Sequence, residues 1–329
     1  MYKELLDLLV CPKSGESLEL INANWNSNWE VMSGALVNEE QTCVYQIVEG
    51  IPRFVETSNY ADNFGLQWNK FKSLQLDSCS GLNISHDRFW GATKWDRRQI
   101  EGKWILDAGC GSGRFAEIAL NAGANVVALD FSTAVDACYK NLGHHKNLHL
   151  VQGDIYCLPF KDQSFDFIYS LGVLQHTPNV EVAFKSLPAK LKKEGQLCVD
   201  YYWKRFRTML NAKYLVRPLV RNLSNEQLLV LVEKYTPLML RINSIFLKIP
   251  LIGTFLRRLV PVADYRGIFP FTQEQVKQIA ILDTFDMLSP AYDKPQRKTT
   301  VRKWFQDIGF EDIKVSHVAH LVAKGTKPK

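Results

Sequence analysis

The chain has 329 residues, of which 46% are hydrophobic and 22% are charged, and its formal net charge is +6. This length predicts a main domain with additions, and the absence of any run of 18 apolar residues excludes a transmembrane helix. The N-terminal sequence MYKELLDLLVCPKSGE carries acids among its leucines, which is untypical of a signal peptide. The seven cysteines are scattered and odd in number, so we expect free thiols and a cytoplasmic location rather than a disulfide framework.

The first hundred residues predict two small units. Residues 1–57 predict a β-rich unit that a short helix opens, with the strand VYQIVEGIPRFV broken between Gly50 and Pro52. Residues 58–100 are rich in aromatic side chains and predict helices that form a linker or lid over whatever follows.

A regular alternation of strands and helices follows in residues 101–202. The predicted strands are WILDAG, ANVVALDF, LHLVQGDI, FDFIYSLG and QLCVDYY. Such alternation predicts a parallel, doubly wound α/β sheet that helices cover on both faces. Residues 203–296 interrupt it with a helical cap, and residues 297–329 return to the sheet with one helix and the strands FEDIKVS and HVAHLVAKG.

The most informative motif is the glycine-rich turn after the first of these strands, Asp107-Ala-Gly109-Cys-Gly111-Ser-Gly113. Glycines let the backbone turn sharply and approach a ligand closely, and the following helix presents free N–H groups. The spacing is GxGxG, and Arg114 takes the place of the third glycine of a dinucleotide fingerprint. An acid two residues before the first glycine suits a cationic ligand better than a pyrophosphate.

Polar residues also end the next three strands, at Asp130, Asp154 and Ser170. The carboxylate of Asp130 suits ribose hydroxyls, and that of Asp154 can accept a hydrogen bond from an adenine amino group. Ser170 lines the open edge of the sheet. Each acid alone could equally be a helix cap or a turn residue, but their order along the chain favours a nucleoside site.

Three segments, ILDAGCGSGRF, VVALDFS and GDIYCLPFKDQSFDFIYSLGVLQHTP, resemble the class I S-adenosylmethionine-dependent methyltransferases of the small-molecule type. The resemblance covers about residues 103–202 and 297–325, and it implies a seven-stranded sheet with an antiparallel last strand and S-adenosylmethionine as cofactor. Gln175 and LKKEG depart from the usual pattern at positions that cofactor binding does not need. The cofactor-binding residues that we expect are Asp107, Gly109, Gly111, Gly113, Asp130, Phe131, Asp154, Ile155 and Ser170.

Other segments resemble neighbours of such domains. NFGLQWNKF and LDTFDMLSP are similar to segments that flank the domain in a bacterial subfamily. Residues 5–55 resemble the zinc-ribbon partner proteins of methyltransferases, but Cys11 is the one ligand of four that remains. Ser14 takes the second position, and Asn38 and Gln41 fall near the others. Because tetrahedral zinc needs four donors, we expect no metal and a relic of the ribbon that serves packing.

The resemblance implies methyl transfer to a small-molecule, glycan or lipid-linked acceptor, and we expect an oxygen acceptor. An oxygen acceptor must lose a proton, and His176 and Tyr202, which follow the fourth and fifth strands, are the candidate catalytic residues. A core-edge histidine and a plain strand end are the alternatives for these two positions. A catalytically inactive cofactor-binding module is a rival function, against which the intact acids argue. An RNA methyltransferase is another, against which the missing Asn/Asp-Pro-Pro-aromatic tetrad argues, so we do not expect nucleic acid as a partner.

The cap carries an uneven charge. Residues 204–266 hold twelve Lys or Arg and three acids, a net charge of +9, and TMLNAKYLVRPLVRNL and INSIFLKIPLIGTFLRRLV interleave aliphatic and basic residues. This composition is typical of helices at an anionic membrane surface, and the alternative is a cap whose leucines pack inward. The positions of four arginines would decide between these alternatives: Arg217, Arg221, Arg257 and Arg258. Arginines that face the cofactor would indicate a phosphate-bearing acceptor, and arginines beside exposed leucines would indicate a peripheral membrane contact.

Overall fold

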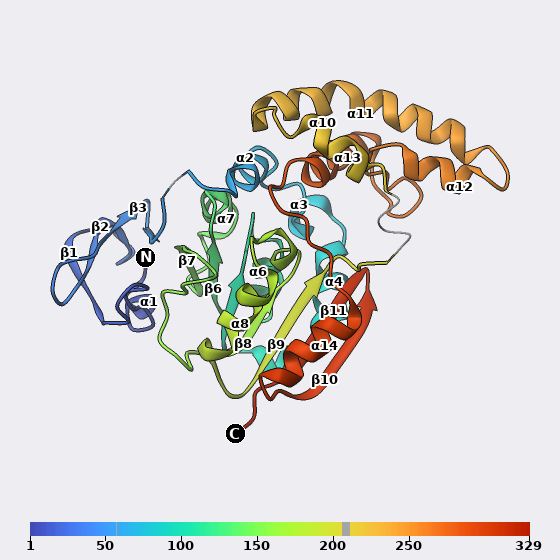
Figure 1. The fold of residues 1–329 in the computed structure, drawn as a ribbon. Helices are drawn as coiled ribbons and strands as arrows, with labels where there is room; N and C mark the ends of the chain where they lie inside the picture. The colour runs from blue at the N-terminus through green and yellow to red at the C-terminus, as the bar shows by residue number, and fades with distance from the viewer. Residues whose placement is uncertain (57, 206–210) are drawn as a thin grey trace.

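The computed structural model describes residues 1–56, 58–205 and 211–329, and its central feature is one eleven-stranded sheet (Figure 1). The strand order across the sheet is β1-β2-β3-β4-β7-β6-β5-β8-β9-β11-β10. The last strand in the chain, β11, is antiparallel to both of its neighbours, as expected. The expected total of seven strands was wrong, because four strands of the N-terminal unit extend the same sheet.

The strands are β1 (Leu18–Trp25), β2 (Val31–Asn38), β3 (Val44–Val48), β4 (Ile51–Arg53), β5 (Trp104–Ala108), β6 (Asn125–Asp130), β7 (Leu148–Gln152), β8 (Phe165–Ser170), β9 (Leu191–Tyr201), β10 (Glu311–Val318) and β11 (His320–Thr326). The described helices before the cap are α1 (Lys3–Leu6), α2 (Asp62–Lys70), α3 (Asp77–Ser80), α4 (Ile84–Thr93), α5 (Arg97–Ile100), α6 (Arg114–Asn121), α7 (Ala134–Leu142), η1 (Leu174–His176) and α8 (Val180–Lys190). The later ones are α10 (Lys213–Val220), α11 (Asn225–Leu247), α12 (Gly253–Leu256), η2 (Arg257–Leu259), α13 (Gln273–Leu288) and α14 (Lys298–Asp307).

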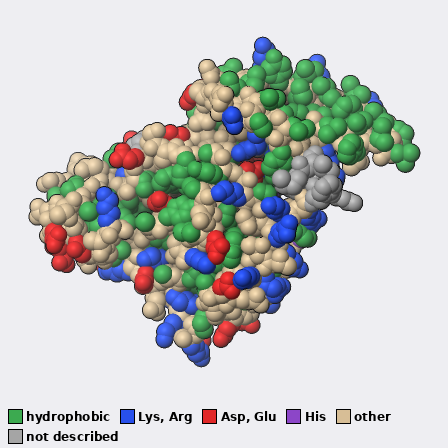
Figure 2. Space-filling view, in the orientation of Figure 1, with side chains coloured by type: hydrophobic (Ala, Val, Ile, Leu, Met, Phe, Trp, Pro, Cys, Tyr) green, Lys and Arg blue, Asp and Glu red, His purple; other side chains and the backbone are tan. Residues whose placement is uncertain are grey.

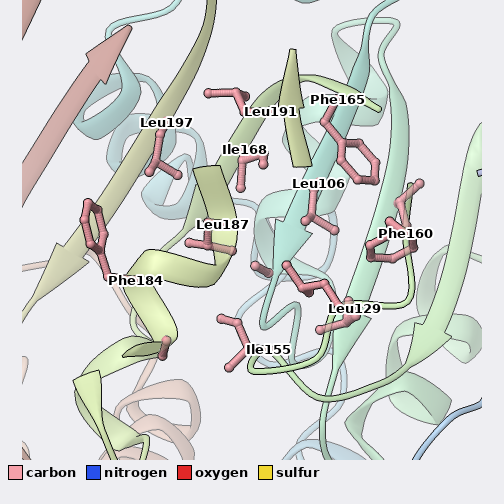
Figure 3. Packing of buried hydrophobic residues seen from close by; sticks show 14 of the residues in the cluster. Leu106, Leu129, Ile155, Phe160, Phe165, Ile168, Phe184, Leu187, Leu191 and Leu197 are labelled. Carbon is pink, nitrogen blue, oxygen red and sulfur yellow. The ribbon is translucent and has the colours of Figure 1, made fainter. Parts of the chain in front are cut away.

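The central strands are buried on both faces, because successive side chains of a strand point to opposite sides. In β5, Leu106 packs on the side covered by α8 and α14, whereas Ile105 packs on the side covered by α4, α6 and α7. Figure 3 shows Leu106 and Leu129 of neighbouring strands together with Leu187 of α8. Burying one such leucine stabilises the fold by about 1.5–3 kcal/mol, so these two layers hold the sheet rigid beneath the site.

The N-terminal unit is fastened to this core rather than separate from it. Its buried Leu5 and Leu36 belong to the same hydrophobic cluster as the central strands. Strand β4 pairs in parallel with β7 through Arg53 and Gln152, and the Arg53 guanidinium also forms an ion pair with Asp136 at 2.6 Å. The predicted end of this unit, residue 57, lies outside the described residues.

The linker helices connect the core with the cap. Helix α2 contacts α7 of the core on one side and α11 and α13 of the cap on the other. The short helix α5 begins with a capping box between Asp96 and Gln99, which satisfies N–H groups that a helix start leaves unpaired. Residues between the N-terminal unit and β5 therefore bridge two parts of the molecule.

The cap consists of α10 to α13 and lies above the carboxyl edge of the sheet (Figure 1). Capping boxes begin both long helices, with Ser224 and Gln227 at α11 and Thr272 and Gln275 at α13. The inner sides of α10, α11 and α13 share a hydrophobic cluster of their own: Val220, Leu228, Leu229, Val232, Ile281, Phe285 and Leu288. Residues 208–210, the start of the first predicted aliphatic and basic segment, lie outside the described residues. Within the described ranges, no helix combines the length and the apolar character needed to cross a bilayer.

Candidate active site

A cavity of about 840 Å³, including its open mouth, lies where β5, β6, β7 and β8 end. Gly109, Asp130, Gly153 and Gly172, each of which follows or ends one of these strands, line its inner wall. Ligands of open parallel sheets bind outside the carboxyl ends of the strands, so the cavity lies where the motifs predicted it.

The glycine-rich turn forms the floor of this cavity. Gly109, Gly111 and Gly113 have φ angles of +100°, +52° and +92°, which residues with a Cβ rarely adopt. A Cβ on Gly109 would lie 2.4 Å from Val173, and one on Gly113 would lie 2.7 Å from the sulfur of Cys138. The first two glycines line the cavity, whereas Gly113 precedes α6 and packs against α7. The turn can therefore approach a ligand only with glycine at these positions.

Asp130 is held in place by the glycine-rich turn and by its own β-strand end. Its Oδ2 accepts a hydrogen bond from the Gly111 N–H at 2.9 Å, and its Oδ1 accepts from the N–H and the hydroxyl of Ser132 at 2.9 and 2.7 Å. Burial raises the pKa of Asp130, although these hydrogen bonds oppose the shift. The carboxylate lines the cavity in a fixed orientation, which suits a bound ligand with neighbouring hydroxyls.

The next part of the wall is apolar and flat. Phe131, Gly153 and Ile155 line the cavity, and the Tyr60 ring lies against Phe131 with centroids 4.9 Å apart. The Asp154 carboxylate accepts from the N–H of Tyr156 at 2.8 Å, and among the described residues its neighbours line the cavity while Asp154 does not. Aromatic and aliphatic walls of this kind suit a planar ring.

Two other expected cofactor contacts, Asp107 and Ser170, are buried and are not among the described residues that line the cavity. The Ser170 hydroxyl donates to the carbonyl of Ala108 at 2.7 Å and so joins β8 to β5. Burial raises the pKa of Asp107 to about 8, and within the described chain its Oδ2 has no hydrogen-bond partner. A buried carboxylate oxygen without a partner is costly, and a cationic ligand group nearby would stabilise its charged form.

His176 lies in the cavity wall, in η1 directly after the fourth strand of the core. Its Nδ1 is 3.0 Å from the carbonyl oxygen of Tyr292, which can only accept, so Nδ1 carries the proton. In the neutral imidazole Nε2 is then the atom with a free lone pair. The ring packs between Phe64 and Tyr202, with centroids 5.3 and 5.4 Å away.

Tyr202 lies beside the cavity, not in the described part of its wall. Its hydroxyl donates to Asp286 at 3.4 Å, and burial raises its pKa well above the ordinary value. The phenol therefore keeps its proton at neutral pH. In this position Tyr202 can orient His176 and Asp286.

Phe64 and Trp68 line the wall but were not expected as site residues, although their segment was singled out in the sequence. Phe64 and Trp68 come from NFGLQWNKF, and Asp286 comes from LDTFDMLSP. The structure brings these two segments together, since the Asn63 amide donates to the Ser289 hydroxyl at 3.1 Å. The sequence signal for these wall residues was that both segments flank such a domain. Nothing in either segment predicts that the two meet over the cavity.

A partly buried cation also lines the cavity. The Arg114 guanidinium donates to the side-chain oxygens of Gln75 at 2.5 Å and Ser85 at 3.2 Å, and it lies over the Phe115 ring. Burial lowers the pKa of Arg114 to about 10, so it remains charged at neutral pH. Nearby, burial raises the pKa of Asp283 to about 6.

Asp200, at the end of β9, positions the turn after β8. Its Oδ1 accepts from the Gly172 N–H at 2.5 Å, and its Oδ2 forms an ion pair with Arg88 at 2.8 Å. Because both oxygens are engaged and the side chain is buried, Asp200 supports the cavity wall from behind.

These features fit S-adenosylmethionine. The glycine turn permits close approach of a ligand backbone, Asp130 suits the ribose hydroxyls, and the slot beside Phe131 and Ile155 suits the adenine. Asp107 is buried outside the described cavity wall, but the charge of its carboxylate would favour a nearby cationic group, and the cofactor carries two.

Comparison with known proteins assigns the domain. Residues 106–199 match the family model described as a methyltransferase domain. The chain is 34% identical over 108 residues to the sterol 24-C-methyltransferase of Pneumocystis carinii (strain B80), which is 31% of this chain and 28% of that protein. The chain thus spans under a third of the length of this curated relative.

Solved structures with low similarity include a putative S-adenosylmethionine-dependent methyltransferase from Methanococcus maripaludis, with 13% identity and a TM-score of 0.45 over 84% of this chain and 97% of that one. Another is the magnesium protoporphyrin IX methyltransferase of Synechocystis PCC 6803 with bound S-adenosylhomocysteine, with 15% identity and a TM-score of 0.45 over 82% and 96%. Likenesses of this size say nothing about the acceptor. The family match confirms, for this domain, the expected enzyme class and its cofactor, S-adenosylmethionine.

Proposed function

We propose that the chain transfers a methyl group from S-adenosylmethionine to the oxygen of a small-molecule, glycan or lipid-linked acceptor. The observation that carries this proposal is the continuity of the cavity. One space runs from Gly109 and Asp130, at the cofactor end, to Arg114, His176 and Asp286 under the cap. An acceptor held at the second end can therefore reach the methyl group without leaving the protein.

When bound, S-adenosylmethionine supplies a methyl group on a sulfonium, which needs no further activation. The protein's part is alignment in a site shielded from water, which can lower the barrier by about 7–11 kcal/mol. Transfer would replace the C–S bond of the bound cofactor with a C–O bond, and the acceptor hydroxyl would lose its proton. His176 Nε2 accepts that proton, and the Nδ1–H bond to the Tyr292 carbonyl stabilises the imidazolium that results.

The acceptor end offers polar contacts for a hydroxylated molecule. Asp286 can accept from a donor group, and the charged guanidinium of Arg114 can donate to an electron-rich oxygen. The apolar rings of Phe64 and Trp68 cover the space between the two ends. A small polar head on a larger apolar body fits this combination.

The proposal is tested with methyl-labelled S-adenosylmethionine and three acceptor pools: a lipid extract, a polar metabolite extract and bulk tRNA. We expect label in the lipid or metabolite pool, and fragmentation of the labelled product to show a methyl ether. Asp130→Ala, which removes a cofactor contact, should abolish the signal. Label in tRNA alone, or a methyl group on carbon or nitrogen, would overturn the proposed acceptor class.

We further propose that the N-terminal unit keeps the ribbon shape without metal. Cys11 is buried with its sulfur 3.3 Å from the Tyr45 hydroxyl, and the Asn38 amide donates to the Glu16 carboxylate at 2.7 Å. These contacts join the turns that would carry the ligands in the resembled proteins. Elemental analysis should find no stoichiometric zinc in the purified chain, and one zinc ion per chain would contradict this.

A further inference from the structure

The outer surface of the cap is unusually apolar. Of the 20 large hydrophobic side chains that are exposed in the described chain, 14 lie between Leu215 and Ile268. Leu219 is 81% exposed, and Leu251, in the turn after α11, is fully exposed. Figure 2 shows hydrophobic side chains gathered over α10 to α12, with a few Lys and Arg among them. Contiguous apolar surface of this kind marks an interaction site.

Helix α11 is apolar on two faces. Its inner residues, such as Leu229 and Val232, pack in the hydrophobic cluster with α13. Its outer face exposes Leu231, Leu238 and Ile245 at intervals of seven residues, and this face has no covering element in the described chain. A helix that needed only to fold onto the core would carry polar residues there.

Basic residues that form no ion pair within the described chain lie beside this apolar face. Lys234 and Arg241 of α11 and Lys248 at its end repeat every seven residues next to the exposed apolar row, and all three are exposed. Glu233, in contrast, is paired with Lys70 of α2 at 2.5 Å. The outer face of α11 is therefore cationic as well as apolar.

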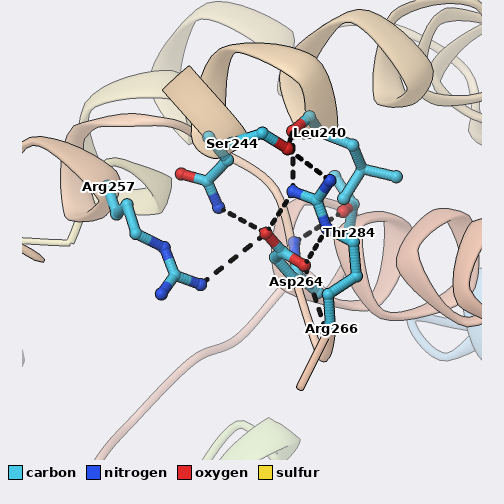
Figure 4. A network of polar contacts seen from close by, with 8 residues as sticks. Leu240, Ser244, Arg257, Asp264, Arg266 and Thr284 are labelled. Atoms are coloured by element: carbon cyan, nitrogen blue, oxygen red, sulfur yellow. Dashed lines mark hydrogen bonds and ion pairs between the residues drawn. The ribbon is translucent and has the colours of Figure 1, made fainter. Parts of the chain in front are cut away.

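The four arginines that the sequence analysis singled out divide into two pairs. Arg217 donates to backbone carbonyls of α13 and the following turn, and Arg257 contacts Asp264 at 3.6 Å. Figure 4 shows that Asp264 also binds Arg266, which ties the segment after η2 to α11. Arg221 and Arg258 are exposed, with the exposed Leu219 two residues before the first and the exposed Leu259 directly after the second. Among the described residues, none of the four lines the cofactor cavity.

We propose that this cap surface docks on an anionic lipid bilayer, with the outer face of α11 in the plane of the interface. Such an interface buries apolar side chains among its acyl chains, and its anionic headgroups attract Lys and Arg. A second copy of the chain is a poorer occupant, because apposing two such faces would bring unpaired basic residues together. The helices would lie on the bilayer and not cross it.

This docking goes beyond methyl transfer and does not depend on it. It is tested by flotation of the full chain at low salt with vesicles of phosphatidylcholine, alone or mixed with phosphatidylglycerol. The apolar variant is Leu231→Gln/Leu238→Gln/Ile245→Gln. Its matched control changes three exposed valines outside the cap to glutamine, at Val44, Val48 and Val182. A charge variant is Arg241→Gln/Lys248→Gln.

We expect the wild type and the valine control to float with the mixed vesicles, and the apolar variant to stay at the bottom. Each basic residue removed should weaken binding about fivefold, and high salt should weaken it further. Binding of S-adenosylhomocysteine should be the same in all variants, which shows that they fold. Failure of the wild type to float, or equal flotation of the apolar variant, would overturn the proposal. Self-association that the apolar variant abolishes, without flotation, would assign the face to a second copy instead.

Discussion

The cofactor edge of the sheet and the cap differ in how their residues are used. At the sheet edge the Asp130 carboxylate has a fixed orientation, because three hydrogen bonds hold it. The cap buries one side of α11 in a cluster of its own and leaves the other side apolar and exposed. The first region is suited to hold one ligand, whereas the second is suited to bind a surface.

The two regions meet at His176 and Asp286. His176 belongs to the turn after β8, and Asp286 belongs to α13 of the cap, so the acceptor end of the cavity needs both parts. Changes confined to one region should therefore separate cofactor binding from methyl transfer.

The change His176→Gln should lower the rate of methyl transfer by about 10²–10⁴-fold while cofactor affinity stays the same. The amide can still donate to the Tyr292 carbonyl, but it cannot accept a proton at neutral pH. Single-turnover rates with labelled cofactor measure the first quantity, and calorimetry measures the second. A variant rate within a few-fold of the wild type would remove His176 from the role of base.

The cap should depend on Phe285 for its own stability. Phe285 is fully buried in the cap cluster, so Phe285→Ala should destabilise this region by about 3–5 kcal/mol. The matched change Phe255→Ala removes a half-exposed ring and should alter the free energy of unfolding by less than about 0.5 kcal/mol. Denaturant titration with hydrogen exchange distinguishes loss of the cap from global unfolding. Equal effects of the two changes would show that the cap is not built as a separate layer.

Cofactor affinity should vary with pH through Asp107. The folded-state pKa is raised to about 8, so the ligand-free protein holds a proton there from the ordinary carboxyl range up to pH 8. A cationic ligand group favours the ionised form, so affinity should rise by up to about tenfold per pH unit below pH 8 and level off above it. Asp107→Asn cannot ionise, so it should remove this slope, and it should also remove the loss of stability that the wild type shows as pH rises from the ordinary carboxyl range to about 8. Parallel slopes in the two proteins would separate Asp107 from the cofactor.

The core was predictable from sequence because its signals are local. Alternating burial in the strands, the three glycines and the acids at strand ends each depend on neighbouring residues. The extension of the sheet to eleven strands was not predictable, since it depends on one pairing between Arg53 and Gln152, 99 residues apart. The same holds for Asn63 and Ser289, which bring the linker and the cap over the cavity.

At the site, sequence position predicted which strand end a residue occupies but not where its side chain goes. Asp130 and Ser170 end β6 and β8, the two strands that pair with β5. The Ser170 hydroxyl donates to a backbone carbonyl of β5, whereas the Asp130 carboxylate lines the cavity. Arg114 departs from the dinucleotide fingerprint, and the structure places it in the cavity wall. Its neighbours Gln75 and Ser85 come from the linker, whose packing no local pattern specifies.

The most direct test of the account is calorimetry of the wild type and Asp130→Ala with S-adenosylmethionine, S-adenosylhomocysteine and NAD. We expect the first two ligands to bind the wild type with micromolar affinity and NAD not to bind. Loss of the Asp130 carboxylate should weaken the binding of both ligands by at least about tenfold, because hydrogen bonds to a charged group contribute more binding free energy than those between neutral groups. The exposed Asp162→Ala serves as control and should bind like the wild type. Binding of NAD at this site, or unchanged affinity in Asp130→Ala, would contradict the assignment of this sheet edge to S-adenosylmethionine.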